Sequence, residues 1–123
     1  MSKILIVDDS PTMRQMLLSI IKRTGSETVE AANGKEALER LKPDMDLVLT
    51  DYHMPEMGGQ ELVDKIRKGK VNPKIPILIL TTERSEQIIE ECRQAGASGW
   101  INKPVKSQQL LETIDRFLLK MEF

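Results

Sequence analysis

The chain has 123 residues, of which 40% are hydrophobic and 30% charged, and its 18 basic and 19 acidic side chains leave a formal net charge of -1. A chain of this length forms one domain that buries roughly two-thirds of its unfolded surface, so we expect a core that needs neither disulfides nor a structural metal. The near-neutral charge argues against a protein that coats nucleic acid or binds membranes through a basic patch, and one Trp, one Tyr and two Phe are too few for a base-stacking surface.

The start of the chain has the character of neither a signal peptide nor a membrane anchor. The apolar run at residues 4–7 is too short and is followed at once by Asp8 and Asp9, and no run approaches the ~20 apolar residues of a membrane-spanning helix. The single cysteine, Cys92, cannot form an internal disulfide, which indicates a reducing compartment. We therefore expect a cytoplasmic protein that inserts into no membrane, with one domain over residues 1–123.

Apolar runs of strand length alternate with segments of helical period along the chain. After a first predicted strand at residues 4–7, Ser10 is expected to cap a helix, with Pro11 at its first position and Gly25 at its end. A weaker strand is predicted at 28–31. The apolar face of the first helix is expected to bury Met13, Met16, Leu17, Ile20 and Ile21.

The middle of the chain continues this alternation. A short helix around residues 37–41 precedes a third strand at 47–50, and a fourth strand lies within 75–80. The helix between these two strands ends in the charged stretch 67–70, which we expect to be exposed to solvent. This helix is expected to bury Leu62, Val63 and Ile66.

The last part of the chain contains two more predicted helices and one strand. The fourth helix has a thinner apolar stripe than the first and the last, with Cys92 expected to be buried and Gly96 at its end. A fifth strand at 98–101 leads to a helix that Ser107 is expected to cap. The last helix is expected to bury Leu110, Leu111, Ile114, Phe117, Leu118 and Met121.

Five strand–helix units in alternation predict an α/β fold, with a parallel sheet covered by helices on both faces. The carboxyl ends of parallel strands meet at one edge of the sheet, where open α/β sheets bind their ligands. The polar side chains that follow four of the five strands are Asp8, Asp9, Asp51, Thr81, Thr82 and Lys103. We therefore expect these side chains to gather at one edge.

This set of side chains suits phosphoryl transfer. Three carboxylates in one crevice repel one another, and with Lys103 beside them a divalent cation would bring the local charge to zero. Ligands that are all oxygen favour Mg²⁺ over zinc. A hydroxyl and an ammonium opposite the acids can hold a phosphate, and an aspartate can itself take the phosphoryl group as a nucleophile.

The four motifs at this edge resemble those of bacterial response-regulator receiver domains. They are Ile-Leu-Ile-Val-Asp8-Asp9, Asp51-Tyr-His-Met-Pro-Glu-Met-Gly-Gly59, Leu-Thr81-Thr82-Glu83 and Trp100-Ile-Asn-Lys103-Pro104. Their order and intervals match over essentially the whole chain, which looks most like a stand-alone, CheY-like receiver of the chemotaxis type. The resemblance implies a flavodoxin-like five-stranded parallel sheet in the order 2-1-3-4-5, with five helices on its two faces.

The resemblance also implies a role for each matching residue. Asp51 would be the phosphoacceptor, and Asp8, Asp9 and Asp51 would hold Mg²⁺ together with the backbone carbonyl of His53. The phosphoryl oxygens would be bound by Thr81, the backbone of Thr82 and Lys103. The peptide bond between Lys103 and Pro104 is cis in such domains.

Other residues would govern the lifetime of the phosphate and the outgoing signal. His53 and Glu83, each two positions after a key residue, would tune the rate at which phosphate is lost. Trp100 stands at the aromatic switch position, where the family usually has Tyr or Phe, and would move with Thr81 on activation unless the bulkier indole stays packed in place. The expected partner surface consists of Ile89, Trp100 and Lys106.

The resemblance therefore implies a phosphorylation-activated switch of a two-component system, not an enzyme, with autocatalysed phosphotransfer and autodephosphorylation as its only chemistry. Its partners would be a CheA-like histidine kinase and a flagellar motor switch protein or another downstream target, with a phosphatase as a further candidate. No nucleic-acid partner is expected, and the protein is expected to be a monomer. With no output domain expected beyond residues 1–123, the signal would leave through non-covalent contact.

Four other functions fit the sequence less well. A phosphorelay intermediate would pass its phosphate to a histidine phosphotransfer protein, but residues 81–83 and 96–101 look more like chemotaxis receivers. An aspartate-nucleophile phosphohydrolase would carry an acid at the position of His53 and a cap for its substrate. A Rossmann-type nucleotide-binding module would carry G-x-G-x-x-G after the first strand, and a receiver that no longer accepts phosphate would not need the complete set of acids, hydroxyl and lysine.

Overall fold

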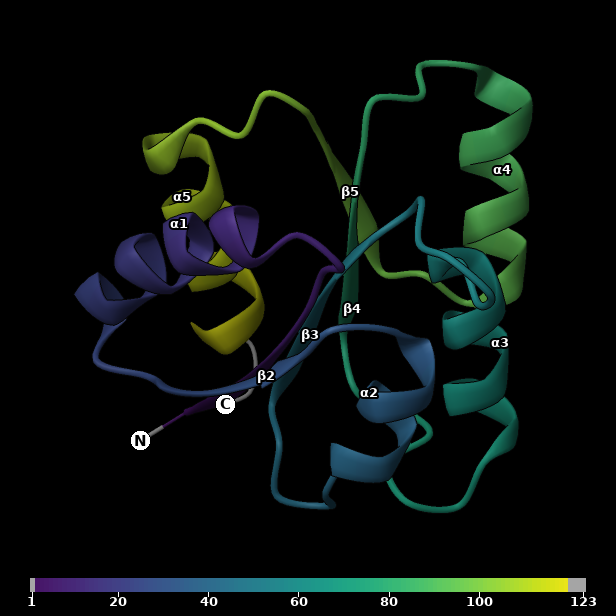
Figure 1. The fold of residues 1–123 in the computed structure, drawn as a ribbon, viewed down its shortest axis with the longest axis horizontal. Coiled ribbons are helices and arrows are strands. Elements are labelled where there is room, and N and C mark those ends of the chain that lie inside the picture. Colours follow the sequence, from purple (N-terminus) through teal and green to yellow (C-terminus); the bar gives the residue numbers. More distant parts are fainter. Residues whose placement is uncertain (1, 120–123) are drawn as a thin grey trace.

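The computed structural model describes residues 2–119, in which five strands alternate with five α-helices (Figure 1). The strands are β1 (Lys3–Val7), β2 (Glu27–Ala31), β3 (Leu47–Asp51), β4 (Ile77–Thr81) and β5 (Gly99–Asn102). The helices are α1 (Pro11–Ile21), α2 (Gly34–Arg40), α3 (Gly59–Lys68), α4 (Glu86–Ala95) and α5 (Ser107–Leu119), and a 3-10 helix, η1 (Lys22–Thr24), continues α1. Within residues 2–119, no helix has the length and apolar character needed to cross a bilayer.

The strands form one sheet in the order β2-β1-β3-β4-β5, and every neighbouring pair is parallel. Strands β3 and β4 are buried along their whole length, because they lie at the centre of the sheet and are covered on both faces. Figure 1 shows α1 and α5 on one side of the sheet and α2, α3 and α4 on the other. The predicted fold, including the strand order, is therefore confirmed.

The sheet divides the buried apolar residues into two clusters. One cluster lies beneath α1 and α5 and includes Leu17, Ile21 and Ile114. The other lies beneath α2, α3 and α4 and includes Leu62 and Ile66. Alternate side chains of each strand point to opposite faces, so every strand can contribute to both clusters.

Helix α1 begins as predicted but buries a narrower face. The side-chain oxygen of Ser10 accepts a hydrogen bond from the backbone N–H of Met13, and Gly25 follows η1 with a left-handed φ of 76°. Leu17, Ile20 and Ile21 are buried. The prediction that Met16 is buried is wrong, because its side chain lies on the flank of this stripe and the residue is 38% exposed.

The charged stretch 67–70 is exposed only in part, because Arg67 folds back onto the protein. Its Nε atom donates to the carbonyl oxygen of Gly96 at 3.0 Å, and its Nη1 atom donates to the carbonyl oxygens of Ile75 at 2.6 Å and Pro73 at 2.9 Å. Burial lowers the pKa of the guanidinium below its ordinary value. Lys68, the next residue, remains exposed as predicted.

Helix α4 agrees with expectation, whereas α5 differs at its start and in the extent of its buried face, since Leu111, Phe117 and Leu118 are only partly buried. Helix α4 buries only Cys92 among its residues and ends at Gly96, which has a left-handed φ of 113°. Ser107 is the first residue of α5 instead of its cap, since the carbonyl oxygen of Lys106 accepts the hydrogen bond from the N–H of Leu110. The expected burial of Met121 lies outside the described residues.

Candidate functional site

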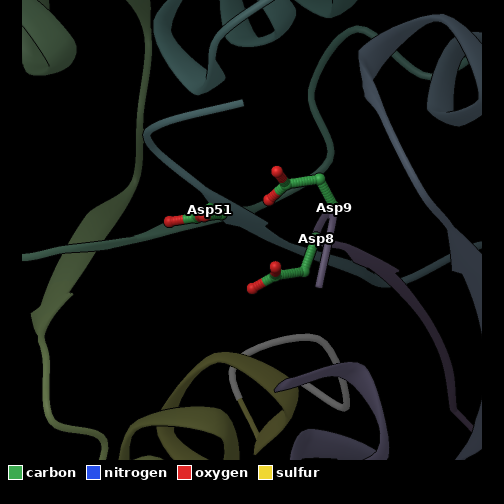
Figure 2. Close-up of side chains that lie close together, drawn as sticks. All are labelled: Asp8, Asp9 and Asp51. Carbon is green, nitrogen blue, oxygen red and sulfur yellow. The ribbon is translucent and has the colours of Figure 1, made fainter. Parts of the chain in front are cut away.

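Three carboxylates meet at the carboxyl edge of the sheet. Asp8 and Asp9 follow β1, and Asp51 is the last residue of β3, which pairs with β1. One oxygen from each of the three carboxylates lies within 4.8 Å of the others (Figure 2). Neighbouring parallel strands therefore bring together acids that are 43 residues apart in the chain, from Asp8 to Asp51.

Asp8 is the most constrained of the three acids. The residue is 2% exposed, its Oδ1 atom accepts a hydrogen bond from the N–H of Ser10 at 2.9 Å, and its own N–H donates to the carbonyl oxygen of Ala31 at 3.1 Å. Its Oδ2 atom is buried and is the only such side-chain atom without a hydrogen-bond partner among residues 2–119.

Burial is the main cause that raises the pKa of the Asp8 carboxyl, because the low-dielectric surroundings disfavour its charged form. The hydrogen bond from Ser10 acts in the opposite direction, as does the ammonium of Lys103. The negative charges of Asp51 and Asp9 raise the pKa further. The site would therefore be stabilised by an additional cation.

The acids fit a hard divalent cation. Their donors are all oxygen, they come from two neighbouring strand ends, and the unpartnered Oδ2 atom of Asp8 is a ligand that the described residues leave unused. Mg²⁺ binds through one or two carboxylates and keeps several waters, which suits a cluster in which Asp8 and Asp51 are buried and Asp9 is exposed. The observed donor set is therefore compatible with the predicted Mg²⁺.

Lys103 directly follows the carboxyl end of β5 and reaches this cluster with its side chain. Its Nζ atom lies 2.9 Å from the Oδ1 atom of Asp51, and the two side chains are 20% and 8% exposed. The N–H of Lys103 donates to the carbonyl oxygen of Thr81 at 2.9 Å, and its bond to Pro104 is cis, as the resemblance implies. The ammonium partly offsets the charge of the acids.

Thr81 ends β4 beside these residues, and its side chain is buried. Its hydroxyl oxygen accepts a hydrogen bond from the N–H of Glu83 at 2.9 Å. Thr82, in contrast, is exposed. The sequence did not single out Asn102, whose side-chain amide donates to the carbonyl oxygen of Glu83 at 2.9 Å and so ties the end of β5 to the loop that follows β4.

His53 and Glu83 contact one another and join the loops that follow β3 and β4. The Nε2 atom of His53 lies 3.0 Å from the Oε1 atom of Glu83, and the His53 side chain is 61% exposed. The side chain of His53 therefore faces solvent. The contact itself was not predicted, because it joins two loops that are 30 residues apart in sequence.

Trp100 lies on the edge strand β5 and is 40% exposed, so it is not packed in the core. The guanidinium of Arg93 lies over its ring, 5.6 Å from the centroid. Beside the indole is a hollow of about 160 Å³, whose lining includes Thr81, Ile89 and Cys92. Two of the residues predicted for the partner surface, Ile89 and Trp100, therefore line one hollow.

Lys106, the third predicted surface residue, is exposed at the start of α5 and lies outside the lining of that hollow. Sequence reasoning also missed Arg14, whose guanidinium donates to the carbonyl oxygen of Asp8 at 2.5 Å. The available signal was its place in the first turn of a helix that directly follows the acid pair, outside the apolar stripe.

The protein resembles known chemotaxis proteins along nearly its whole length. The family model of the response regulator receiver domain matches residues 4–115. Chemotaxis protein CheY1 of Helicobacter pylori (strain ATCC 700392 / 26695) is 40% identical over 116 residues, which cover 92% of this chain and 94% of that protein. Chemotaxis protein CheY-3 of Vibrio cholerae serotype O1 is 39% identical over 121 residues, which cover 97% of this chain and 93% of that protein.

Solved structures with the same architecture include proteins of low and moderate identity. Chemotaxis protein CheY4 of Vibrio cholerae superposes with a TM-score of 0.89 at 39% identity, covering 95% of this chain and 98% of that chain. A two-component response regulator from Clostridium difficile superposes with a TM-score of 0.91 at 24% identity over the full length of both chains. The second likeness concerns the fold alone.

Proposed function

The chain belongs to the response regulator receiver domain family, and we propose that its phosphorylation switch operates through Asp51 as the phosphoacceptor. As a CheY-like chemotaxis response regulator, it is a phosphoacceptor signalling protein and not an enzyme. The observation that carries the proposal is the ion pair between Asp51 and Lys103, 2.9 Å long, beside two further acids at the carboxyl edge of the sheet. This arrangement supports the proposal, since it sets a carboxylate that can act as nucleophile beside an ammonium that can pair with the transferred phosphoryl group.

In the proposed reaction, a carboxylate oxygen of Asp51 attacks the phosphorus of a phosphohistidine on a kinase. The new P–O bond forms as the P–N bond breaks; the electron pair of that bond stays on the ring nitrogen of the kinase histidine, which takes up a proton from water. Mg²⁺ held by Asp8, Asp9, Asp51 and the carbonyl of His53 would offset the negative charge that gathers in this transfer. Asp8 and Asp9 themselves take no part in bond formation.

The bound phosphoryl group would then be held by side chains that already lie next to Asp51. The ammonium of Lys103 would pair with one phosphoryl oxygen, and the hydroxyl of Thr81 would donate to another, since a hydroxyl that accepts from Glu83 can still donate its own hydrogen. The backbone of Thr82 would bind alongside them. This change of partner by Thr81 would begin the conformational response.

The outgoing signal would leave through Ile89, Trp100 and Lys106. The proposal is supported by the hollow beside Trp100, which Thr81 also lines, so a movement of the hydroxyl changes the space available to the indole. A CheA-like histidine kinase would supply the phosphoryl group in the cytoplasm, and a flagellar motor switch protein or another target would bind the phosphorylated monomer. A phosphatase is a further proposed partner.

The phosphate lifetime would be set by the contact between His53 and Glu83, which joins the two loops that flank Asp51. The pair would order or block the water that attacks the phosphoryl group. We expect His53→Ala and Glu83→Ala each to change the rate constant of dephosphorylation, measured by loss of label after the kinase is removed. Rate constants equal to that of the wild type in both variants would contradict this role.

The main proposal is tested by adding a small phosphodonor to wild type and Asp51→Asn, each with Mg²⁺ and with a chelator. We expect an acid-stable, hydroxylamine-labile phosphate on wild type with Mg²⁺ only, since hydroxylamine cleaves acyl phosphates. Wild type that never gains this phosphate would overturn the proposal. Rapid onward transfer to a histidine phosphotransfer protein, without strengthened binding to a flagellar switch peptide, would favour a relay.

A further inference from the structure

We propose that Arg14 is a positioning residue, which holds Asp8 in the orientation that binds the divalent cation. The inference rests on the proposed function, because it concerns the same metal site. Arg14 lies in the first turn of α1, and its side chain is only 17% exposed. Its Nη1 atom donates to the carbonyl oxygen of Asp8 at 2.5 Å, and its Nε atom donates to the Oε1 atom of Glu30 at 3.1 Å. One guanidinium thus connects α1, the end of β1 and strand β2.

This contact completes a set of bonds that leaves Asp8 a single free oxygen. The N–H of Asp8 donates to Ala31, its Oδ1 atom accepts from Ser10, and its carbonyl oxygen accepts from Arg14. Only Oδ2 lacks a partner, which leaves it available to a cation bound by the three acids. The bond from Arg14 fixes the peptide between Asp8 and Asp9, and this peptide leads directly to the Ser10 N–H that holds the Asp8 carboxylate in place.

Arg14 acts on the backbone of Asp8 and not on its carboxylate. The charges that act on the carboxylate come from Asp51, Lys103 and Asp9. Removing the guanidinium should therefore weaken metal binding through lost orientation, as the removal of groups that orient metal ligands does in other sites. A loss of net charge alone would strengthen the binding of a cation, so the two effects have opposite signs.

Arg40, the last residue of α2, offers a control because it also contacts Glu30 of β2. Its guanidinium donates to the carbonyl oxygen of Glu30, and it lies 3.5 Å from the carboxylate of Glu36. Like Arg14, it connects a helix to Glu30 of β2, Arg14 through the Glu30 carboxylate and Arg40 through the Glu30 carbonyl, but the contacts of Arg40 do not include the acids of the site. The comparison of the two arginines separates positioning of Asp8 from general support of β2.

The test measures the dissociation constant of Mg²⁺ by calorimetry for full-length wild type, Arg14→Met, Arg14→Lys and Arg40→Met. We expect Arg14→Met to weaken Mg²⁺ binding by about tenfold, Arg14→Lys to lose less because a lysine still donates one hydrogen bond, and Arg40→Met to stay within about twofold of wild type. If Arg14→Met does not fold, the comparison of Arg14→Lys with Arg40→Lys decides, with the greater loss expected for Arg14→Lys.

A second readout needs no metal. In the presence of a chelator, the amide proton resonance of Ser10 reports its hydrogen bond to Asp8, and we expect an upfield shift in Arg14→Met but not in Arg40→Met. Equal Mg²⁺ affinity and equal Ser10 resonances in the Arg14 and Arg40 variants would overturn the inference while the proposed function stands. Wild type that binds no Mg²⁺ would overturn both.

Discussion

At the scale of single residues, the buried carboxylate of Asp8 lowers the stability of the folded protein, and the same carboxylate is a candidate ligand for a divalent cation. Its carboxyl is almost wholly buried, and one of its oxygens has no hydrogen-bond partner among the described residues. Leaving a buried polar group unpaired costs about 1 to 3 kcal/mol, and more for a charged group. The metal-free protein therefore carries a local instability that a bound cation would relieve.

The pH dependence of this effect has a definite sign. The Asp8 carboxyl titrates near its ordinary value of 3.8 when unfolded, and its pKa in the folded protein is higher. Its contribution to stability is thus complete below pH 3.8 and is lost as the pH rises through the folded pKa, because the folded state binds the proton more tightly. At neutral pH the full cost remains.

We therefore expect Asp8→Asn to raise the free energy of unfolding of the metal-free protein at neutral pH by about 1 to 3 kcal/mol. This gain in unfolding free energy should vanish below pH 3.8, where the Asp8 carboxyl is protonated. In the presence of Mg²⁺ the gain should shrink or reverse, because only the wild-type carboxylate is stabilised by binding the ion. Urea unfolding with and without a chelator measures each case. Asp44 is the control, because its hydrogen bond from Lys3 lowers its pKa, so Asp44→Asn should not stabilise.

At the scale of the elements, Arg67 joins the end of α3 to the segments that enter β4 and β5. Its guanidinium donates to three backbone carbonyls, those of Pro73, Ile75 and Gly96. We expect Arg67→Met to lower the free energy of unfolding by about 2 kcal/mol, since it leaves partly buried carbonyls without donors. Lys68→Met, one residue along, removes only an exposed ion pair and should cost less than about 0.5 kcal/mol. Equal losses in the two variants, measured by urea unfolding, would contradict this role of Arg67.

Helix α4 is the element with the fewest buried side chains among the longer helices, since Cys92 alone is buried. A helix held by few apolar contacts moves at low cost. Its contact with β5 includes the guanidinium of Arg93 over the ring of Trp100, which holds the indole at the surface. Phosphorylation that frees space behind Thr81 would therefore act on the least anchored helix.

We expect the emission of Trp100 to shift to shorter wavelength when a small phosphodonor and Mg²⁺ are added, because the indole would leave solvent for the adjacent hollow. It is the only tryptophan, so no other emission obscures the change. Asp51→Asn should show no shift. Arg93→Ala should increase the shift per phosphorylated molecule, since it removes the contact that favours the outer position. An unchanged spectrum of phosphorylated wild type would mean that the indole does not move.

The elements also differ in how far they could be predicted. The parallel sheet and the acid cluster were accessible because both depend on local patterns: apolar runs, and the polar residues Asp8, Asp9 and Asp51 where those runs end. The order of the strands came from the resemblance to receiver domains, because apolar runs alone do not say which strands are neighbours. The contacts of Arg67 and His53 were not, because each joins segments about thirty residues apart whose approach depends on packing between loops. Hydrophobic periodicity does not distinguish an exposed flank from a buried stripe, which is why the burial of Met16 was mispredicted. The exposure of Arg67 was mispredicted because a charged stretch does not show which of its side chains reaches backbone carbonyls elsewhere in the fold.

At the scale of the whole molecule, the sheet separates two apolar clusters. Ile21 of α1 belongs to one and Ile66 of α3 to the other, and both are almost fully buried.

We expect Ile21→Val and Ile66→Val each to lower the free energy of unfolding by about 1 kcal/mol. In the double variant the costs should add to within about 0.5 kcal/mol, because the two sites share no partner. Urea unfolding of the three variants measures the difference. A larger deviation from additivity would contradict the independence of the two clusters. The control is the double variant Ile21→Val with Ile114→Val, in which both residues belong to one cluster and the two costs in unfolding free energy need not add.

The separation of the two apolar clusters by the sheet affects how the sequence of such a protein can change in evolution. A substitution beneath α1 and α5 can be compensated only by its neighbours in that layer, and the same holds beneath α2, α3 and α4. The layers can therefore drift independently over generations. The layer that contains α4 can then adapt its outer surface to a new partner, while the opposite layer keeps the acids in register.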